Sequence, residues 1–227
     1  FKDANTQGVV LRINSPGGSP VQAGYINDEI RRLRAKYPNT PLYAVVQDLC
    51  ASGGYYVAAA ADRIYVDKAS LVGSIGVIMG SFGFTGAMEK LGIDRRAYFS
   101  GDNKDFLDPF LPENPAQREH AQKMLAEIHQ QFINAVRQGR GKRLKETPEM
   151  FSGLVWTGER SVELGLADGL GSLEYVAREV IKAEKIVDYS PKDNIFEQLS
   201  ERLGTQFGAS VGRAVVDSAS RSALGVR

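Results

Sequence analysis

Two glycine turns, each lying between an apolar run and a helical pattern, constrain the fold of this chain more than any other feature. The apolar run at residues 8–14 is followed by the turn at 15–20. The run at 41–46 is followed by Ser52-Gly53-Gly54 and the alanine-rich segment 57–61. Successive strand–turn–helix units favour a parallel sheet, whose strands end side by side where ligands bind. The sequence therefore predicts an α/β fold with both turns at one edge of the sheet.

Ser52 is the strongest candidate for a catalytic residue in this pattern. A helix N-terminus offers unpaired N–H groups and a partial positive charge, which stabilise the oxyanion formed when a serine attacks a carbonyl. Glycines let backbone N–H groups approach a ligand closely, so Gly18 and Gly53 are candidate donors to one oxygen. The alternative is an ordinary turn in which Ser52 only caps the helix. A phosphate-binding loop is disfavoured because no Gly-Lys-Ser/Thr sequence follows the glycines.

The histidines argue against a Ser–His–Asp triad. The chain has two, His120 and His129, and both fall in a helix predicted over residues 115–138. Nine residues at about 100° each place them on opposite helix faces. We therefore expect each histidine at the surface or flank of the helix, and a Ser–Lys dyad becomes the natural alternative.

Lys104 is the candidate base of such a dyad. It lies among the large apolar residues Phe99, Phe106 and Phe110, in a segment too rich in Gly, Asp and Pro for regular structure. A lysine acts as a base only when it is neutral, and burial under apolar side chains favours the neutral amine. The alternative is an ordinary solvated lysine in a loop.

Four separate motifs in this order and spacing resemble one family. They are Asn-Ser-Pro-Gly-Gly at 14–18, Ala-Ser-Gly-Gly-Tyr-Tyr at 51–56, Val-Gly-Ser-Ile-Gly-Val at 72–77, and Ser-Gly-x-x-Lys-Asp at 100–105. Together they resemble the bacterial signal peptide peptidase A family of Ser–Lys proteases, in its half-length, protease IV-like form. The resemblance extends from about Gly8 to Leu173.

The resemblance implies a role for five residues. The family's nucleophile matches Ser52 and its general base matches Lys104. Its oxyanion-hole donors match Gly18 and Gly53, and the serine that hydrogen-bonds the lysine amine matches Ser74. We expect neither a cofactor nor a metal ion.

The resemblance also implies an architecture and a setting. The family's fold is crotonase-like, related to the Clp protease, with repeated strand–strand–helix units. Half-length members form octamers in which neighbouring subunits contribute the serine and the lysine. The expected substrates are hydrophobic peptides such as signal peptide remnants. The expected location is the periplasmic side of the bacterial inner membrane, with a membrane anchor upstream of Phe1 and a soluble catalytic fragment.

Composition excludes several other classes of protein and of site. The net charge of +1 provides no electrostatic footprint for nucleic acid. The single cysteine, Cys50, excludes an internal disulfide and a multi-cysteine zinc site. It is expected to be a buried structural residue rather than a thiol nucleophile. Two alternatives to a peptidase remain, namely a crotonase-type acyl-CoA enzyme and a non-catalytic subunit of an assembly.

The rest of the chain predicts further elements of one catalytic domain, 1–190, and a C-terminal tail, 191–227, that packs on a neighbouring subunit or is mobile. Strands are predicted at 63–67, 71–79 and 186–189, and helices at 21–37, 115–138 and 173–181. A short helix ends near Gly92, and 161–168 reads as a helix and turn. An extended peptide substrate could pair with the strand at 71–79, with core packing as the alternative.

Overall fold

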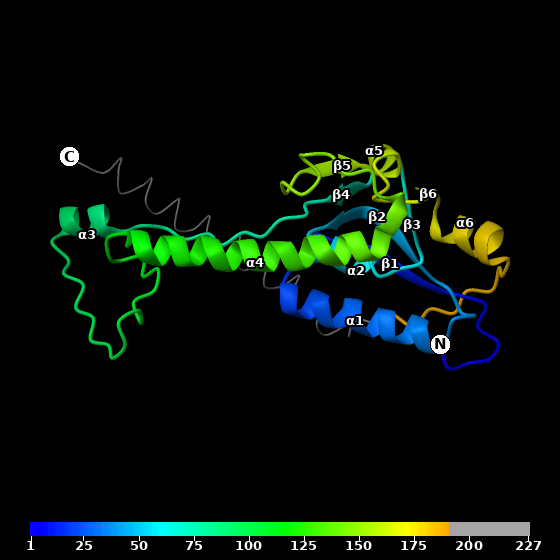
Figure 1. Cartoon of the computed structure of the whole chain (residues 1–227), viewed down its shortest axis with the longest axis horizontal. Helices are drawn as coiled ribbons and strands as arrows, with labels where there is room; N and C mark the ends of the chain where they lie inside the picture. The colour runs from blue at the N-terminus through cyan, green and yellow to red at the C-terminus, as the bar shows by residue number, and fades with distance from the viewer. Residues whose placement is uncertain (191–227) are drawn as a thin grey trace, which may run out of the picture. The chain divides into compact units, whose positions relative to one another are not determined.

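The computed structural model describes residues 1–190, and Phe1–Lys185 form one compact unit. The predicted tail at 191–227 lies outside the described residues. The strands are β1 (Val9–Ser15), β2 (Leu42–Ala51), β3 (Arg63–Val66), β4 (Leu71–Gly73), β5 (Val155–Thr157) and β6 (Gly169–Leu170) (Figure 1). The helices are α1 (Pro20–Lys36), α2 (Gly53–Ala58), α3 (Thr85–Leu91), α4 (Pro115–Arg140), the 3₁₀ turn η1 (Gly141–Arg143), α5 (Gly158–Glu163), α6 (Leu173–Tyr175) and the π-helical turn η2 (Val176–Ile181).

The strands form one six-stranded sheet in which β2 is the central member. The order is β5-β4-β2-β3-β6, and β1 also pairs with β2. The long strand β2 pairs with β3 through its first half and with β4 through its second half. The pairs β1–β2, β2–β3, β2–β4 and β3–β6 are parallel. Among the described strands, β5 alone runs antiparallel to its neighbour, β4. The predicted α/β fold with a parallel sheet is confirmed.

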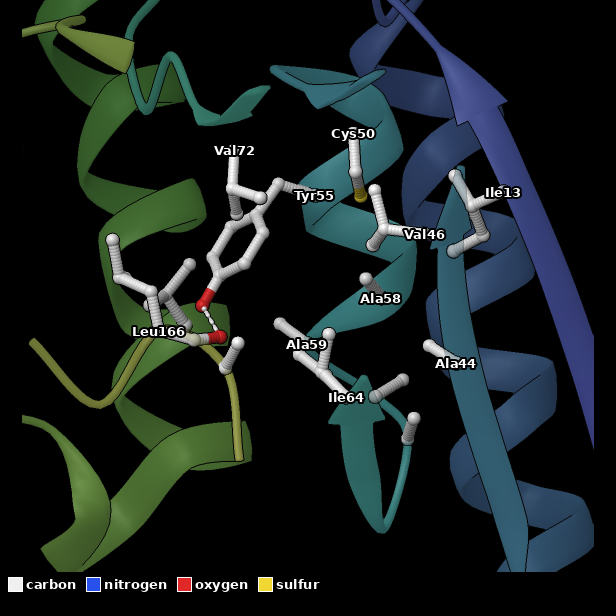
Figure 2. Close-up of a cluster of buried hydrophobic side chains, with 14 of the residues drawn as sticks. Ile13, Ala44, Val46, Cys50, Tyr55, Ala58, Ala59, Ile64, Val72 and Leu166 are labelled. Carbon is white, nitrogen blue, oxygen red and sulfur yellow. Dashed lines mark hydrogen bonds between the residues drawn. The ribbon is translucent and has the colours of Figure 1, made fainter. Parts of the chain in front are cut away.

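The hydrophobic core lies between the sheet, α2 and the C-terminal half of α4. Ile13, Val46 and Ile64 from three strands meet Ala58 of α2 and the buried alanines that directly follow it (Figure 2). Tyr55 of α2 is fully buried, and its hydroxyl donates a hydrogen bond to the Leu166 carbonyl at 2.7 Å. A buried tyrosine hydroxyl needs such a partner, because an unpaired polar group in a core costs stability.

Gly139 brings α4 against the end of α2. A Cβ atom at this position would lie 1.8 Å from the carbonyl oxygen of Ala59, so no side chain fits. The helix predicted over residues 115–138 ends two residues too early, because Gly139 lies within it. The helix continues to Arg140, and Gly141, with φ of 53°, forms the C-cap. Close helix packing, rather than helix termination, explains the glycine at 139.

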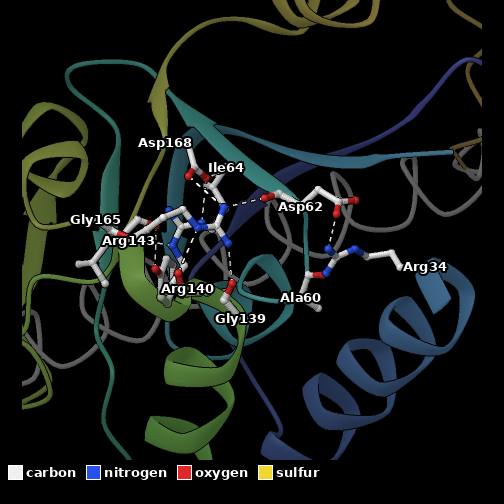
Figure 3. Close-up of polar contacts among 11 residues, drawn as sticks. Arg34, Ala60, Asp62, Ile64, Gly139, Arg140, Arg143, Gly165 and Asp168 are labelled. Atoms are coloured by element: carbon white, nitrogen blue, oxygen red, sulfur yellow. Dashed lines mark hydrogen bonds and ion pairs between the residues drawn. The ribbon is translucent and has the colours of Figure 1, made fainter. Parts of the chain in front are cut away.

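A buried ion pair joins the end of α4 to the sheet. Arg140, whose side chain has no exposed surface, binds the Asp168 carboxylate at 2.8 Å, and Arg143 binds its other oxygen at 3.0 Å (Figure 3). The same carboxylate accepts a hydrogen bond from the backbone N–H of Ile64 in β3. Burial alone would raise the pKa of Asp168, but the hydrogen bond and charge of Arg140 and the further donors lower it.

The N-terminal half of α4 leads away from the sheet to a segment that we call the arm, residues 81–114 (Figure 1). The arm contains α3 and the loop that joins it to α4. Gln117, in the first turns of α4, anchors this loop. Its amide donates to Asp105 at 2.8 Å, and its carbonyl oxygen accepts from the Leu107 N–H at 3.0 Å.

Two predicted strands differ from the structure. The strand predicted at 71–79 ends at Gly73, because Ser74 has a positive φ of 51° and the chain turns there. Residues 186–189, predicted as a strand, have no regular structure. A strand requires hydrogen bonds to a neighbouring strand, which an alternating pattern alone does not supply.

Candidate active site

The carboxyl ends of three strands meet at one edge of the sheet. Ser15 at the end of β1 is in register with Cys50, and Gly73 at the end of β4 is in register with Ala51. Ser52 follows directly, and its N–H donates to the Gly73 carbonyl at 2.8 Å. Both glycine turns therefore lie at the same edge, as the sequence predicts.

Ser52 occupies a strained turn between β2 and α2. Its φ of 51° and ψ of −122° are unfavourable for a residue with a Cβ atom. It stands at the N-cap position of α2, yet its side chain makes no capping hydrogen bond. An ordinary N-cap serine would accept a hydrogen bond from the first turn of the helix. The strained strand-to-helix turn resembles the geometry that exposes a nucleophilic serine in other hydrolases.

The first glycine turn lies directly against Ser52. A Cβ atom at Gly17 would come within 2.7 Å of the Ser52 Cβ and 2.8 Å of the Gly53 nitrogen. A Cβ atom at Gly53 would lie 3.2 Å from the Gly18 nitrogen. The backbones of the two turns are thus in contact, and the Gly18 and Gly53 amides are neighbours beside the serine.

Ser74 lies on the other side of Ser52. It follows Gly73, whose carbonyl accepts the hydrogen bond from Ser52. Its own N–H donates to the Leu154 carbonyl at 2.7 Å, and its carbonyl accepts from the Gly76 N–H at 3.0 Å in a tight turn around Ile75. The structure therefore brings together Ser52, Gly18, Gly53 and Ser74.

Asn14 supports this edge of the sheet, and sequence reasoning assigned it no role beyond its place in a motif. The register between β1 and β2 shifts between Ile13 and Ser15. At this shift the Asn14 side chain bonds to β2: its oxygen accepts from the Leu49 N–H at 3.1 Å and its amide donates to Asp48 at 3.0 Å. An asparagine directly before a glycine turn at a strand end is the signal that could have revealed this bulge.

Lys104 is not brought to Ser52 within one chain. It is exposed, in a turn of the arm where its N–H donates to the Gly101 carbonyl. The arm loop is anchored at Gln117, whereas α2 contacts α4 through the stacked rings of Tyr56 and Phe132. These two anchor points are 15 residues apart on one helix, or about 22 Å at 1.5 Å per residue.

The phenylalanines near Lys104 do not bury it in this chain. Phe110 stacks on Phe84 at a centroid distance of 5.3 Å, and Phe106 contacts the ring of His120 edge-on. Phe99 is half exposed. The apolar surroundings expected for a neutral lysine are therefore absent from the described part of a single chain.

The remaining polar candidates are the two histidines and the cysteine. His120 is exposed on the arm side of α4, as predicted. His129 is half-buried, and its Nε2 lies 3.0 Å from the Ile75 carbonyl oxygen. Cys50 is completely buried, and burial raises the pKa of its thiol to about 12, which confirms a structural role. Within residues 1–190 no cluster of three potential metal ligands occurs.

This arrangement has two of the features that acyl transfer by a serine requires. It places a strained serine next to two backbone amides that can face one oxygen, without a histidine base. Such a site needs a proton acceptor, and within residues 1–190 the exposed Lys104 does not supply it. No helix within residues 1–190 is both long and apolar enough to cross a bilayer.

Comparison with known proteins identifies relatives over most of the chain. A protein of Methanocaldococcus jannaschii, provisionally named a protease, is 33% identical over 94% of this chain and 70% of its own length. A protein of Enterococcus faecium, provisionally named signal peptide peptidase SppA, is 32% identical over 82% of this chain and 54% of its own length.

A third relative carries a different name. A protein of Brucella melitensis named Na(+)/H(+) antiporter NhaA is 45% identical over 76% of this chain. The match covers 23% of that protein, so the chain spans less than a quarter of this relative and about half of the Enterococcus one. A match over so small a share brings no transport activity to this chain.

The model of one protein family matches residues 34–187, about two thirds of the chain, and its description is peptidase family S49. The matched region includes Ser52, Ser74 and Lys104, and it begins after the turn that contains Gly18. The relatives named signal peptide peptidase SppA and Protease 4 agree with this match. The resemblance drawn from the four motifs is confirmed, and the chain belongs to peptidase family S49.

Proposed function

We propose that this chain is one subunit of a serine endopeptidase that cleaves hydrophobic peptides with a Ser–Lys dyad. Ser52 is the nucleophile and Lys104 of a neighbouring subunit is the general base. The observation that supports this most strongly is the strained, uncapped Ser52 beside the Gly18 and Gly53 amides. Membership of a peptidase family supports the reaction class.

The mechanism begins with transfer of the Ser52 hydroxyl proton to the neutral amine of Lys104. The Ser52 oxygen bonds to the carbonyl carbon of a peptide, and the carbonyl electron pair moves to oxygen, where the Gly18 and Gly53 N–H groups stabilise the negative charge. Collapse of this intermediate breaks the C–N bond, and Lys104 returns its proton to the leaving amine. Lys104 then takes a proton from water, and the water oxygen bonds to the ester carbon. The bond between this carbon and the Ser52 oxygen breaks, and Lys104 returns the proton to that oxygen, which releases the acid and regenerates both the serine and the neutral amine. Ser74 orients the lysine amine.

The separation of Ser52 from the arm supports a site shared between subunits. The apolar side chains exposed along the arm supply the desolvation that a neutral lysine needs once a second copy covers them. We further propose the crotonase-like form of the α/β fold, an octameric assembly, signal peptide remnants as substrates, and a membrane-anchored parent protein at the bacterial inner membrane. A relative's name supports the signal peptide substrate.

The proposal is tested with Ser52→Ala and Lys104→Ala, measured by turnover of a fluorogenic hydrophobic peptide. Each variant alone is expected to lose activity while the assembly survives. In an equal mixture of the two, a site shared by neighbours is intact when one subunit keeps its serine and the next keeps its lysine, so about one quarter of the activity returns. If the mixed assembly stays inactive although the subunits exchange, the base acts within its own chain or is another residue.

A fluorophosphonate probe separates the proposal from its two alternatives. A serine peptidase is expected to be labelled at Ser52, and Ser52→Ala to remain unlabelled. A crotonase-type enzyme would instead bind coenzyme A and need no serine, and a non-catalytic subunit would show neither property. Absence of labelling in the intact assembly would contradict the peptidase.

A further inference from the structure

The tight turn around Ile75 leaves one backbone carbonyl that requires an external partner. The Gly76 N–H donates to the Ser74 carbonyl across the turn, and the Ser74 N–H donates to the Leu154 carbonyl. The Ile75 residue is completely buried, and its carbonyl takes no part in these bonds. Among the described residues, its hydrogen-bond partner is His129 Nε2 at 3.0 Å. Without this contact, the carbonyl would be an unpaired polar group in the protein interior.

The chemistry of the contact fixes the role of the histidine. A carbonyl oxygen can only accept a hydrogen bond, so the Nε2 atom of His129 must carry the hydrogen and donate it. In the neutral ring this leaves Nδ1 without a hydrogen, and in the charged ring Nε2 still donates. The bond therefore persists in both protonation states, and it is the position of a donor, rather than a charge, that matters.

His129 is well placed to hold the turn against the rest of the site. It lies on α4 three residues before Phe132, on the same face of the helix, and Phe132 stacks on Tyr56 of α2 at 4.9 Å. One face of α4 thus holds both the helix that follows Ser52 and the turn that begins with Ser74. The positive φ of Ser74 shows that the turn is strained and needs such support.

We propose that His129 is a positioning residue, which acts through the Ile75 carbonyl to hold Ser74 beside Ser52. The inference rests on the proposed role of Ser74 in orienting the lysine amine. Sequence periodicity places His129 on the flank of α4 and gives no sign of this contact, because its partner is a backbone atom 54 residues away.

The test compares variants that keep or lose the donor. His129→Gln places a side-chain N–H near the position of Nε2, whereas His129→Leu fills similar space without a donor. We expect His129→Leu to lower kcat per titrated active site about tenfold with little change in KM, and His129→Gln to recover most of it. Gln131→Leu, at an exposed position on the same helix, is the control and should retain full activity. Equal kcat values for His129→Leu and His129→Gln would overturn the inference.

A double-mutant cycle with Ser74→Ala separates positioning from general stability. If His129 acts through Ser74, then His129→Leu changes kcat less than twofold once Ser74 is alanine, because the coupled pair is already broken. An undiminished tenfold loss in the Ser74→Ala background would show a merely structural role and overturn the inference. If Ser74→Ala loses activity but His129→Leu does not, the inference about His129 is overturned and the proposed role of Ser74 stands. Full activity of Ser74→Ala would overturn both the inference and the proposed role of Ser74.

Discussion

The two ends of α4 differ in how firmly contacts within one chain hold them in place. At the sheet end, the helix is fixed by the Gly139 contact, by the buried Arg140–Asp168 pair and by the stacking of Phe132. At the arm end, large apolar side chains lie exposed, among them Phe82, Leu91 and Tyr98, whose exposed fractions are 78%, 72% and 94%. One chain therefore holds the proposed nucleophile, Ser52, in an ordered turn, but it leaves the proposed base, Lys104, in solvent.

This difference indicates what the arm requires. Contiguous exposed apolar surface on a soluble domain marks a site of interaction. The arm also carries Lys104, and a lysine in the proposed role of a base needs surroundings from which water is excluded. A second copy of the chain that covers the arm would bury these apolar side chains. It would also exclude water from Lys104, as the proposed shared site requires.

The largest difference in stability is expected between two glycine-to-alanine changes. Gly139→Ala places a methyl group where the Ala59 carbonyl lies, so α4 must move away from α2. We expect a loss of about 3 kcal/mol or more in the free energy of unfolding, measured by urea denaturation. Gly86→Ala in α3 meets no atom within 4 Å, and should be neutral or stabilise by up to about 1 kcal/mol. Equal losses would mean that α3 is as tightly packed as the sheet end.

The next effect concerns the buried ion pair. Asp168→Asn leaves the Arg140 guanidinium buried without a counter-charge, and we expect a loss of about 3 kcal/mol at neutral pH. Asp102→Asn, at an exposed position in the arm, is the control and should change stability by less than about 0.5 kcal/mol.

The pH dependence of the same pair has a definite sign. Because the folded state lowers the pKa of Asp168, the carboxylate contributes its full stability above the unfolded value of about 4. That contribution is lost as the pH falls further, through the lower value of the folded protein. The difference between wild type and Asp168→Asn should therefore shrink below about pH 4 in acid unfolding curves. A difference that stays constant down to pH 2 would contradict this assignment.

A smaller loss of stability is expected when the hydrogen bond of the Tyr55 hydroxyl is removed. Tyr55→Phe leaves the Leu166 carbonyl unpaired in the core, which should cost about 1 to 2 kcal/mol. The matched change in the arm, Tyr98→Phe, removes a hydroxyl from a side chain that is already in solvent and should have no measurable effect. Thermal unfolding of both variants checks the pair, and a destabilised Tyr98→Phe would show that the arm is ordered by its tyrosine.

Whether an element depends on local or on distant residues decides whether the sequence can predict it. The strand at 8–14, the helix at 115–138 and the two glycine turns are predicted because each depends on a local pattern. The strands β5 and β6 are missed because they have three and two residues, too few for any periodicity. Their existence depends on neighbours that are distant in sequence.

The site shows this limit at the level of single residues. The place of Ser52 beside the glycines follows from chain order in a parallel sheet, so the sequence predicts it. The contact of His129 with Ile75 joins residues 54 apart and involves a backbone atom, which no side-chain pattern reveals. Lys104 is exposed among residues 1–190, so its apolar sequence neighbours do not predict an apolar environment for it.

The smallest change in stability is expected at Gln117, although its effect on activity is large. Gln117→Leu removes the two hydrogen bonds that anchor the loop of Lys104. Because the arm can open locally without unfolding the sheet, the global free energy of unfolding should change by less than about 0.5 kcal/mol. Activity on the fluorogenic peptide should fall about tenfold, since a loosened loop holds the lysine in position for less of the time. Gln122→Leu, exposed on the same helix, should leave both quantities unchanged. Full activity of Gln117→Leu would contradict the idea that these two hydrogen bonds order the loop, and contacts other than those of Gln117 would then have to hold Lys104 in position.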